Sequence, residues 1–397
     1  MAHKWLLLRF GGIGDAMCCT VAARAIKTKW PQDSVDYAVR GEEQVKMFGN
    51  LRDIFNKVFE IRRFPHPMQG MNCAKTRYGW ENIEVAKEKY DIVIDFVNCV
   101  ENNAMHPKLA EKYGDWMRSQ NSNFQNWADI HLGWCRLDPT EVEDKSPAYL
   151  VESAERKWAK KVLSDYPRPW IGMNFFSSSR ARTLYNVQAI VAATLAKHPG
   201  ATCFVWDNEK WVIVRDGGTK PLGEKTDVRK SAALVEQFDC FAGADSGFSH
   251  IAEAIGTHTV SVYTTVPAWT RNKYYKFTHD VEVTLPCRPC FTLHALCPIN
   301  RQRSQDSLTE REGTILQVSN QGIPIEQASN QFNTSPDKLR QEFQAIQAKM
   351  DGVASVTPDC VASITPDLIV GKITEALDVQ ENGKSAEDVG VGGVANQ

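Results

Sequence analysis

The chain has 397 residues, and its 46 Lys and Arg residues nearly balance its 48 Asp and Glu residues, which gives a formal net charge of −2. This balance excludes a strongly polybasic protein that binds nucleic acid over a broad surface. Hydrophobic residues make up 43% and charged residues 24% of the chain, values typical of soluble globular proteins. At roughly 150 residues per domain, the length predicts two or three domains.

The first apolar run, residues 5–8, is too short for the core of a signal peptide. No stretch approaches the ~20 apolar residues that span a bilayer. We therefore expect a soluble, cytoplasmic protein. The 11 cysteines are spread over a long chain, unlike the disulfide framework of a small secreted protein, so reduced thiols are expected.

Short apolar runs alternate with longer helical patterns along most of the chain, which predicts parallel sheets covered by helices. In the first half, the predicted strands are residues 5–10, 35–39, 58–61 and 92–96, and a helix is predicted over 16–29. After a helix at Ser153–Leu163, the predicted strands are 170–175, 202–206, 240–242 and 259–263. This rhythm predicts an α/β protein of two Rossmann-like halves, in which ligands bind where strands turn into helices.

The turn after the first predicted strand is rich in glycine. Gly11, Gly12 and Gly14 allow a tight turn and the close approach of a ligand to backbone N–H groups. The turn is not a dinucleotide fingerprint, because Met17 occupies the third glycine position, and no Gly-Lys-Ser/Thr of a P-loop follows. Asp15 at the helix start is either a capping acid or a general base that faces the cleft between the halves.

A second glycine turn, residues 243–250, also joins a predicted strand to a helix. Asp245 or Ser246 can cap that helix, and Gly247 leaves its N–H groups accessible to a phosphate. His250 on the first turn is either a structural histidine or part of a ligand site.

Two further strand ends carry polar groups. Ser177, Ser178 and Arg182 follow the strand at 170–175, and they suit phosphate oxygens, with a solvated loop as the alternative. Asp207 and Glu209 follow the strand at 202–206, where a carboxylate could bind a ribose.

At these turns the sequence resembles glycosyltransferase family 9, the heptosyltransferases. Residues 244–257, ADSGFSHIAEAIGT, are similar to the family pattern Asp-Ser/Thr-Gly-x-x-His-Leu-Ala-x-Ala-x-Gly. The segment from Arg9 to Asp15, with Thr20 and Pro31, also resembles the family. The resemblance implies a GT-B fold, with an acceptor domain at 1–150 and a nucleotide-sugar domain at 151–300.

The resemblance also implies an inverting glycosyltransferase that needs no metal or other cofactor for catalysis. Asp15 would be the base that deprotonates the acceptor hydroxyl. The leaving diphosphate would be bound by Ser177, Ser178, Arg182 and the turn from Asp245 to His250, and the ribose by Asp207 or Glu209. The implied donor is an ADP-heptose-like nucleotide sugar, and the implied acceptor is a bacterial glycan such as lipopolysaccharide core, with peripheral contact at the inner membrane for a lipid-linked acceptor.

Four cysteines resemble a cluster found in part of this family. Cys287, Cys290, Cys297 and Cys360 could form a tetrahedral structural zinc site, and a group of reduced core cysteines is the alternative.

Residues 301–357 interrupt the α/β rhythm and predict a helical insertion, followed by a C-terminal helix at 358–380 and a disordered tail at 381–397. By analogy with the family, the C-terminal helix would pack on the first domain. Within the insertion, residues 321–340 resemble a helix-turn-helix that could present Lys338, Gln341 or Gln344 to nucleic-acid bases. The alternative is a helical hairpin that only covers the cysteine cluster.

Three functions remain open from the sequence. The first is transfer of a sugar to a bacterial glycan, and the second is the same chemistry on a hydroxylated base in DNA, suggested by the insertion. The third is a non-catalytic protein that binds a nucleotide sugar.

Overall fold

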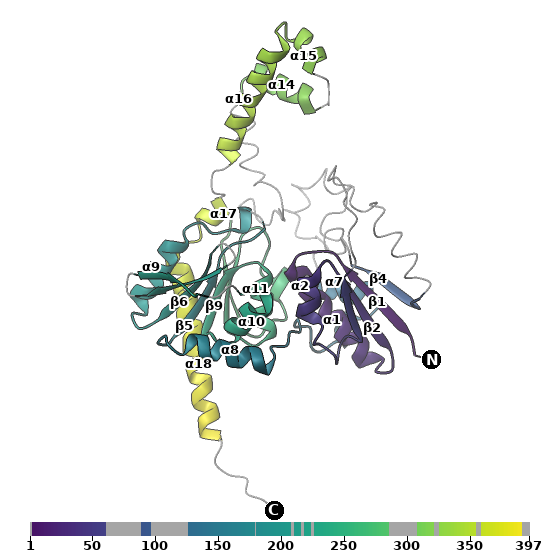
Figure 1. Ribbon diagram of the computed structural model, residues 1–397, viewed down its shortest axis with the longest axis vertical. Coiled ribbons are helices and arrows are strands. Elements are labelled where there is room, and N and C mark those ends of the chain that lie inside the picture. The colour runs from purple at the N-terminus through teal and green to yellow at the C-terminus, as the bar shows by residue number, and fades with distance from the viewer. Residues whose placement is uncertain are drawn as a thin grey trace, which may run out of the picture.

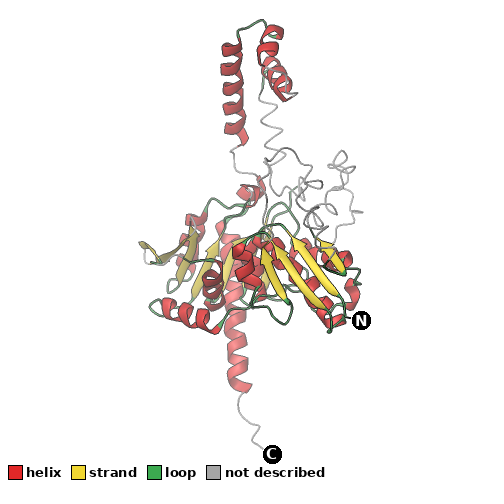
Figure 2. Cartoon of the chain, turned by 45° about the vertical axis from the view of Figure 1, so that its right-hand side comes forward, coloured by secondary structure: helices red, strands yellow, loops and turns green. Residues whose placement is uncertain are grey.

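The computed structural model describes residues 2–60, 89–96, 126–178, 180–207, 210–215, 218–223, 226–285, 308–320, 325–354 and 359–390. Within these residues, two β-sheets stand side by side with helices packed around them (Figures 1 and 2). The predicted α/β class is therefore confirmed.

The first sheet has the strand order β3-β2-β1-β4, and the second has the order β11-β10-β9-β5-β6-β7-β8. The strands are β1 (Lys4–Arg9), β2 (Ser34–Val39), β3 (Lys57–Glu60), β4 (Ile92–Asp95), β5 (Trp170–Asn174), β6 (Thr202–Asp207), β7 (Lys210–Arg215), β8 (Gly218–Pro221), β9 (Cys240–Ala244), β10 (Thr259–Tyr263) and β11 (Thr278–Glu282). Each predicted strand is present, with ends that differ by a few residues at most.

The helices around the sheets are α1 (Ile13–Lys29), α2 (Glu42–Phe48), α7 (Trp127–Trp134), α8 (Ser153–Leu163), α9 (Val187–Lys197), α10 (Val228–Gln237), α11 (Gly247–Ala254), α12 (Trp269–Asn272), α17 (Asp359–Ala362) and α18 (Pro366–Gly390), with short 3-10 turns η2 (Pro139–Glu141) and η3 (Arg180–Arg182). A separate group comprises α14 (Glu310–Asn320), α15 (Ile325–Gln331) and α16 (Pro336–Ala354).

Strand β1 is buried on both faces, as its continuous apolar sequence predicts. Successive side chains point to opposite faces, so Trp5 and Leu7 enter the main core, whereas Leu6 and Leu8 enter a smaller cluster on the other side. Helix α1 follows at once, and the Asp15 carboxylate accepts a hydrogen bond from the Gly12 N–H at 2.8 Å, which caps the helix.

The second sheet departs from the predicted all-parallel pattern at one edge. Strands β7 and β8, which the sequence did not predict, pair antiparallel with their neighbours. Because β7 begins at Lys210 directly after β6 ends at Asp207, the chain has no room for a crossover helix, and the pair must be antiparallel.

One apolar core connects the two halves. Buried residues from the first half, such as Trp5 and Phe48, belong to the same cluster as Trp211 and Phe241 of the second sheet. The shared core holds the carboxyl ends of β1 and β9, and the turns that follow them, in a fixed relation.

The C-terminal helix α18 packs on the second sheet, so the expectation that it packs on the first domain is wrong. Ile369 and Ile373 are fully buried with Val260 and Cys240 on the face of the second sheet that α9 also covers. An apolar sheet face must be covered by another element, and here α18 supplies that cover.

Helix α18 also continues to Gly390, into the segment predicted to be disordered. The glycines of this segment led to the prediction of disorder. Glu381, Lys384 and Ala386 lie between them and have a high helix propensity, which favours the observed extension. Residues 391–397 lie outside the described residues.

Helices α14, α15 and α16 form a unit that stands away from both sheets (Figure 1). Its small core contains Ile315, Leu339 and Ile346. The turn between α15 and α16 includes Asn333 at a φ of 50°, a left-handed conformation that asparagine tolerates. The predicted helices are therefore present, and their reading as a helix-turn-helix stays a prediction.

Across the described ranges, no helix combines the length and the apolar character needed to cross a membrane.

The buried face of α18 gives a test of its packing. We expect Ile373→Ala to lower the free energy of unfolding by about 2–5 kcal/mol, because it leaves a cavity against the second sheet. Leu368→Ala on the exposed side of the same helix is the matched control and should change this free energy by less than about 0.5 kcal/mol. Urea unfolding of both variants measures the difference, and equal effects would contradict the assigned packing.

Candidate functional site

The two glycine turns meet where the halves of the molecule join. A Cβ atom on Gly247 would lie 2.8 Å from Ile13 Cγ2 and 3.2 Å from the backbone nitrogen of Gly14. A Cβ atom on Gly14 would lie 2.8 Å from Cδ2 of His250. Both glycines are therefore required by the close approach of the N-terminus of α1 to the N-terminus of α11.

A cavity of about 470 Å³ opens beside this contact. It is lined by Gly12, Ile13, Gly14, Asp15, Cys18, Arg40, Trp127, His131, Asn174, Phe176, Ser177, Ser178, Arg182, Trp206, Val228, Asp245, Ser246, Gly247, Phe248, His250, Ile251 and Arg271. The lining comes from both halves, and two helix N-termini, each the positive end of a helix dipole, face the cavity.

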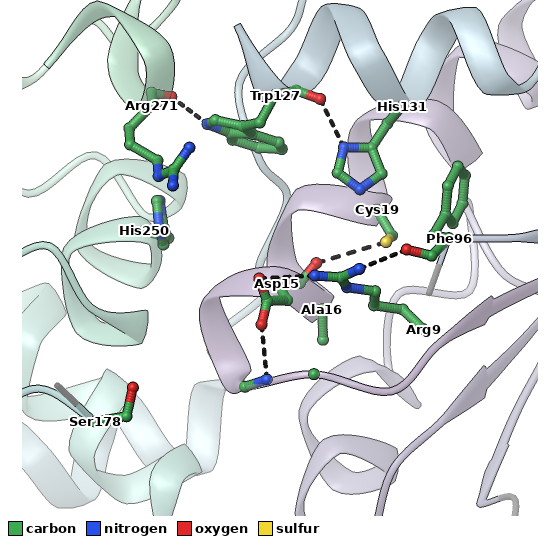
Figure 3. A network of polar contacts seen from close by, with 12 residues as sticks. Arg9, Asp15, Ala16, Cys19, Phe96, Trp127, His131, Ser178, His250 and Arg271 are labelled. Carbon is green, nitrogen blue, oxygen red and sulfur yellow. Dashed lines mark hydrogen bonds and ion pairs between the residues drawn. The ribbon is translucent and has the colours of Figure 1, made fainter. Parts of the chain in front are cut away.

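Asp15 is the acid of the first half that faces the cavity. Its Oδ1 lies 3.0 Å from a guanidinium nitrogen of Arg9, and its Oδ2 accepts the Gly12 N–H (Figure 3). The Asp15 side chain is 45% exposed, whereas Arg9 is buried and also donates to the carbonyl oxygen of Phe96. Gly11 makes room for this carboxylate, since a Cβ there would lie 2.5 Å from Asp15 Oδ2.

The charge of Asp15 is held in its ionised form. Burial alone would raise the pKa of this carboxyl group, but the charge and hydrogen bond of Arg9, with the Gly12 N–H, lower it below its usual value. At neutral pH the group is therefore a carboxylate, which can accept a proton but cannot donate one.

The N-terminus of α11 has the properties of an anion site. Ser246 is the N-cap residue, yet its side chain makes no capping hydrogen bond, and its buried Oγ has no hydrogen-bond partner within the described structure. The first N–H groups of the helix and this hydroxyl therefore lie at the same edge of the cavity. The hydroxyl has no acceptor among the described residues. A phosphate would satisfy such a site.

Arg182 places a cation beside this helix end. Its guanidinium donates to the carbonyl oxygen of Asp245 at 2.8 Å, to Asp245 Oδ2 at 3.3 Å and to Ser178 Oγ at 3.0 Å. Asp245 is 3% exposed, and burial alone would raise its pKa, but nearby groups, foremost the Arg182 and Arg271 charges, together lower it below its usual value. Asp245 is an anion that positions the arginines, so it contributes to a phosphate site only through them.

Two histidines in the cavity wall are neutral at pH 7. Burial and the nearby Arg9 charge lower the pKa of His131 to about 3, and its Nδ1 lies 2.6 Å from the carbonyl oxygen of Trp127. Burial lowers the pKa of His250 to about 4, although the Asp245 charge acts in the opposite direction. His250 Nδ1 lies 2.6 Å from the Tyr275 hydroxyl, so this ring is held by the protein.

The structure brings most of the predicted site residues together. Asp15, Gly12 and Gly14 line the cavity from the first half, and Ser177, Ser178, Arg182, Asp245, Ser246, Gly247 and His250 line it from the second. Gly11 and Asp207 do not line it, and Glu209 lies outside the described residues. At the end of β6 the cavity is lined by Trp206, the residue before Asp207.

Several lining residues were missed from the sequence. Arg40 and Trp206 lie at the carboxyl ends of β2 and β6, so the strand-end rule used for the other turns could have found them. Trp127, His131 and Arg271 belong to no motif, and only the packing of α7 and α12 beside the two turns brings them to the cavity.

Only Cys360 of the four predicted zinc ligands lies within the described residues, so the zinc site stays a prediction. Cys287, Cys290 and Cys297 lie outside the described residues. Cys360 is buried in the apolar cluster between α18 and the second sheet, away from the unit α14–α16, so those helices do not cover it. Among the described residues no three His, Cys, Asp or Glu side chains form a metal-binding group.

Residues 140–298 match the model of glycosyltransferase family 9 (heptosyltransferase). No curated protein matches the chain in sequence. Among solved structures, the ADP-heptose lps heptosyltransferase II of E. coli is similar, with a TM-score of 0.53 and 12% identity, over 95% of this chain and 99% of that one. The glycosyl transferase family 9 structure from Veillonella parvula is also similar, with a TM-score of 0.50 and 14% identity, over 78% of this chain and 91% of that one. These likenesses show the GT-B fold.

The contact between the glycine turns predicts a strong effect of one methyl group. We expect Gly247→Ala to lower the free energy of unfolding by about 1–3 kcal/mol, because the new Cβ overlaps Ile13 near its backbone. Gly371→Ala in α18 is the control, since a Cβ there meets nothing within 4 Å. Urea unfolding measures both, and equal stability of the two variants would exclude a close contact between the turns.

The neutral histidines predict acid sensitivity. In the unfolded chain a histidine titrates near pH 6.5, whereas these two histidines stay neutral in the folded state to a lower pH. Below pH 6.5 the unfolded state therefore binds more protons than the folded state, and the free energy of unfolding falls towards pH 4. We expect His131→Gln to flatten this fall, because glutamine does not titrate. Urea unfolding at several pH values between 7.5 and 4 measures the slope, and a steeper slope in the variant would be inconsistent with a neutral buried His131.

Proposed function

We propose that the chain is a glycosyltransferase of family 9, whose model matches residues 140–298, and that it transfers a sugar from a nucleoside-diphosphate sugar to a hydroxyl group of a bacterial glycan. The observation that carries the proposal is the cavity between the halves, with a carboxylate on one side and an anion site at a helix N-terminus on the other. The donor proposed first is ADP-heptose-like, in line with the E. coli ADP-heptose lps heptosyltransferase II.

Asp15 is the proposed general base. Its carboxylate is ionised, half exposed to the cavity and fixed by Arg9 and Gly12, so it can take the proton of an acceptor hydroxyl that enters from the first half. A lowered pKa makes the carboxylate a weaker base, and its fixed position offsets part of that loss.

The leaving diphosphate is proposed to bind at α11. The Ser246 hydroxyl, the first N–H groups of the helix and the Arg182 guanidinium converge there. As the acceptor oxygen bonds to the anomeric carbon, the bond from that carbon to the phosphate oxygen breaks, and the electron pair stays with the diphosphate. Helix N–H groups and guanidinium groups can stabilise this charge in place of a metal ion.

Inversion at the anomeric carbon is part of the proposal. Asp15 lines the cavity from α1 and the proposed phosphate site from α11, so the base and the leaving group are assigned to different helices. Single displacement from the face opposite the leaving group inverts the configuration.

The described helices α14–α16 do not favour the DNA alternative. Arg311 pairs with Glu342 at 3.1 Å, and Arg340 pairs with Glu326 and Asp337 at 2.8 Å each. These two arginines are therefore engaged with carboxylates, so they do not form a basic face for the phosphates of nucleic acid.

We propose that the enzyme acts in the cytoplasm, with only peripheral contact to a membrane if its acceptor is attached to a lipid.

The role of Asp15 is tested by Asp15→Asn. We expect the variant to retain donor binding and to lose transfer by about 10²- to 10⁴-fold, because asparagine cannot accept the proton. Thermal shifts with ADP-, UDP-, GDP- and CMP-sugars identify the donor, since a ligand of the folded state raises the unfolding temperature.

Transfer is then measured with that donor in both proteins, with Asp91→Asn outside the cavity as the control. Unchanged turnover of Asp15→Asn would remove this residue from the mechanism. Donor binding without any turnover in the unsubstituted protein would instead support a non-catalytic nucleotide-sugar-binding protein.

A further inference from the structure

Arg271 places a second cation of the second half in the cavity. It lies on the single turn of α12, its side chain is 13% exposed, and it lines the cavity with Asp15 and His250. Figure 3 shows its guanidinium group beside His250, on the side of Asp15 opposite to Arg9 and His131. The Arg271 charge lowers the pKa values of both Asp15 and Asp245, so it acts on both walls of the cavity.

Asp245 does not use up the hydrogen-bonding capacity of Arg271. The Nε atom of Arg271 is 3.8 Å from Asp245 Oδ2, beyond hydrogen-bond distance, and Arg182 donates to that same oxygen at 3.3 Å. Within the described residues, the guanidinium group of Arg271 forms no hydrogen bond. A guanidinium group has five N–H donors in a planar fork that fits a phosphate, so this group is available to a ligand.

The backbone of Arg271 is fixed by the other half of the molecule. The indole N–H of Trp127, at the start of α7, donates to the Arg271 carbonyl oxygen (Figure 3). Asn126 Nδ2 donates to the carbonyl oxygen of Trp269 at 2.9 Å, so α12 is held at two successive points. This attachment keeps Arg271 over the cavity without involving its guanidinium group.

We propose that Arg271 is a catalytic residue, which binds the terminal phosphate of the leaving nucleoside diphosphate together with Arg182. The inference rests on the proposed function and assigns a role within it. When the bond between the anomeric carbon and the phosphate oxygen breaks, the diphosphate gains negative charge on that terminal phosphate. Arg182 donates to Asp245 and Arg271 Nε lies 3.8 Å from the same carboxylate, so both guanidinium groups lie near the edge of the cavity where helix α11 begins.

The test compares diphosphates with monophosphates. Calorimetric titration of ADP, UDP, GDP and CDP, and of the matching monophosphates, is carried out on the full chain and on Arg271→Met, Arg271→Lys and Lys273→Met. Arg271→Met removes the charge and keeps the length of the side chain. Lys273→Met removes a neighbouring exposed cation that does not line the cavity and is the matched control.

We expect Arg271→Met to weaken diphosphate binding about 10- to 100-fold, as loss of a charge-assisted hydrogen bond does, and to leave monophosphate binding within about threefold. Arg271→Lys should recover part of the diphosphate affinity, and Lys273→Met should match the unsubstituted protein. With the donor identified above, we also expect Arg271→Met to lower kcat by about 10²-fold.

Each other outcome has a defined meaning. Equal losses for diphosphate and monophosphate would show that Arg271 only maintains the shape of the site, and this would overturn the inference. If Arg271→Met prefers diphosphates over monophosphates by the same affinity ratio as the unsubstituted protein, the inference is also overturned, and the proposed function remains intact. If the unsubstituted protein binds none of the diphosphates, the proposed donor class fails, and the inference fails with it.

Discussion

The contact between the N-termini of α1 and α11 determines the geometry of the site. Gly14 and Gly247 lie so close to the opposing turn that an added methyl group on either would overlap it. Because the dipoles of both helices direct positive charge towards the same cavity, and Arg40, Arg182 and Arg271 also line it, the cavity attracts anions. The two turns stay in contact because residues of both halves pack into one apolar core, which fixes the position of one sheet relative to the other.

Two carboxylates, one buried and one open to the cavity, have different functions in this positive environment. Asp245 is almost completely buried, and its Oδ2 lies 3.3 Å from Arg182 and 3.8 Å from Arg271, so it positions cations. Asp15 is held from behind by Arg9, while its side chain remains open to the cavity. The same interaction that fixes the orientation of Asp15 also lowers its pKa, so a precise position is obtained with a weaker base.

The elements away from the cavity stabilise the second half or stand apart from it. Helix α18 covers an apolar face of the second sheet that would otherwise be exposed, which explains why it does not reach the first half. The helices α14–α16 bury their apolar residues against one another, and none of their described residues lines the cavity between the two Rossmann-like halves.

The amino-acid sequence alone predicts most of the strands and helices, the two glycine turns and 10 of the 22 residues that line the cavity. These features are local, because an apolar run, a glycine or a capping acid acts on its immediate neighbours. The antiparallel strands β7 and β8 and the packing of α18 depend on partners that are distant in the sequence or on the length of a connection. Trp127, His131 and Arg271 have no local pattern, and only the tertiary structure could place them in the site, because α7 and α12 reach it through contacts between the two halves.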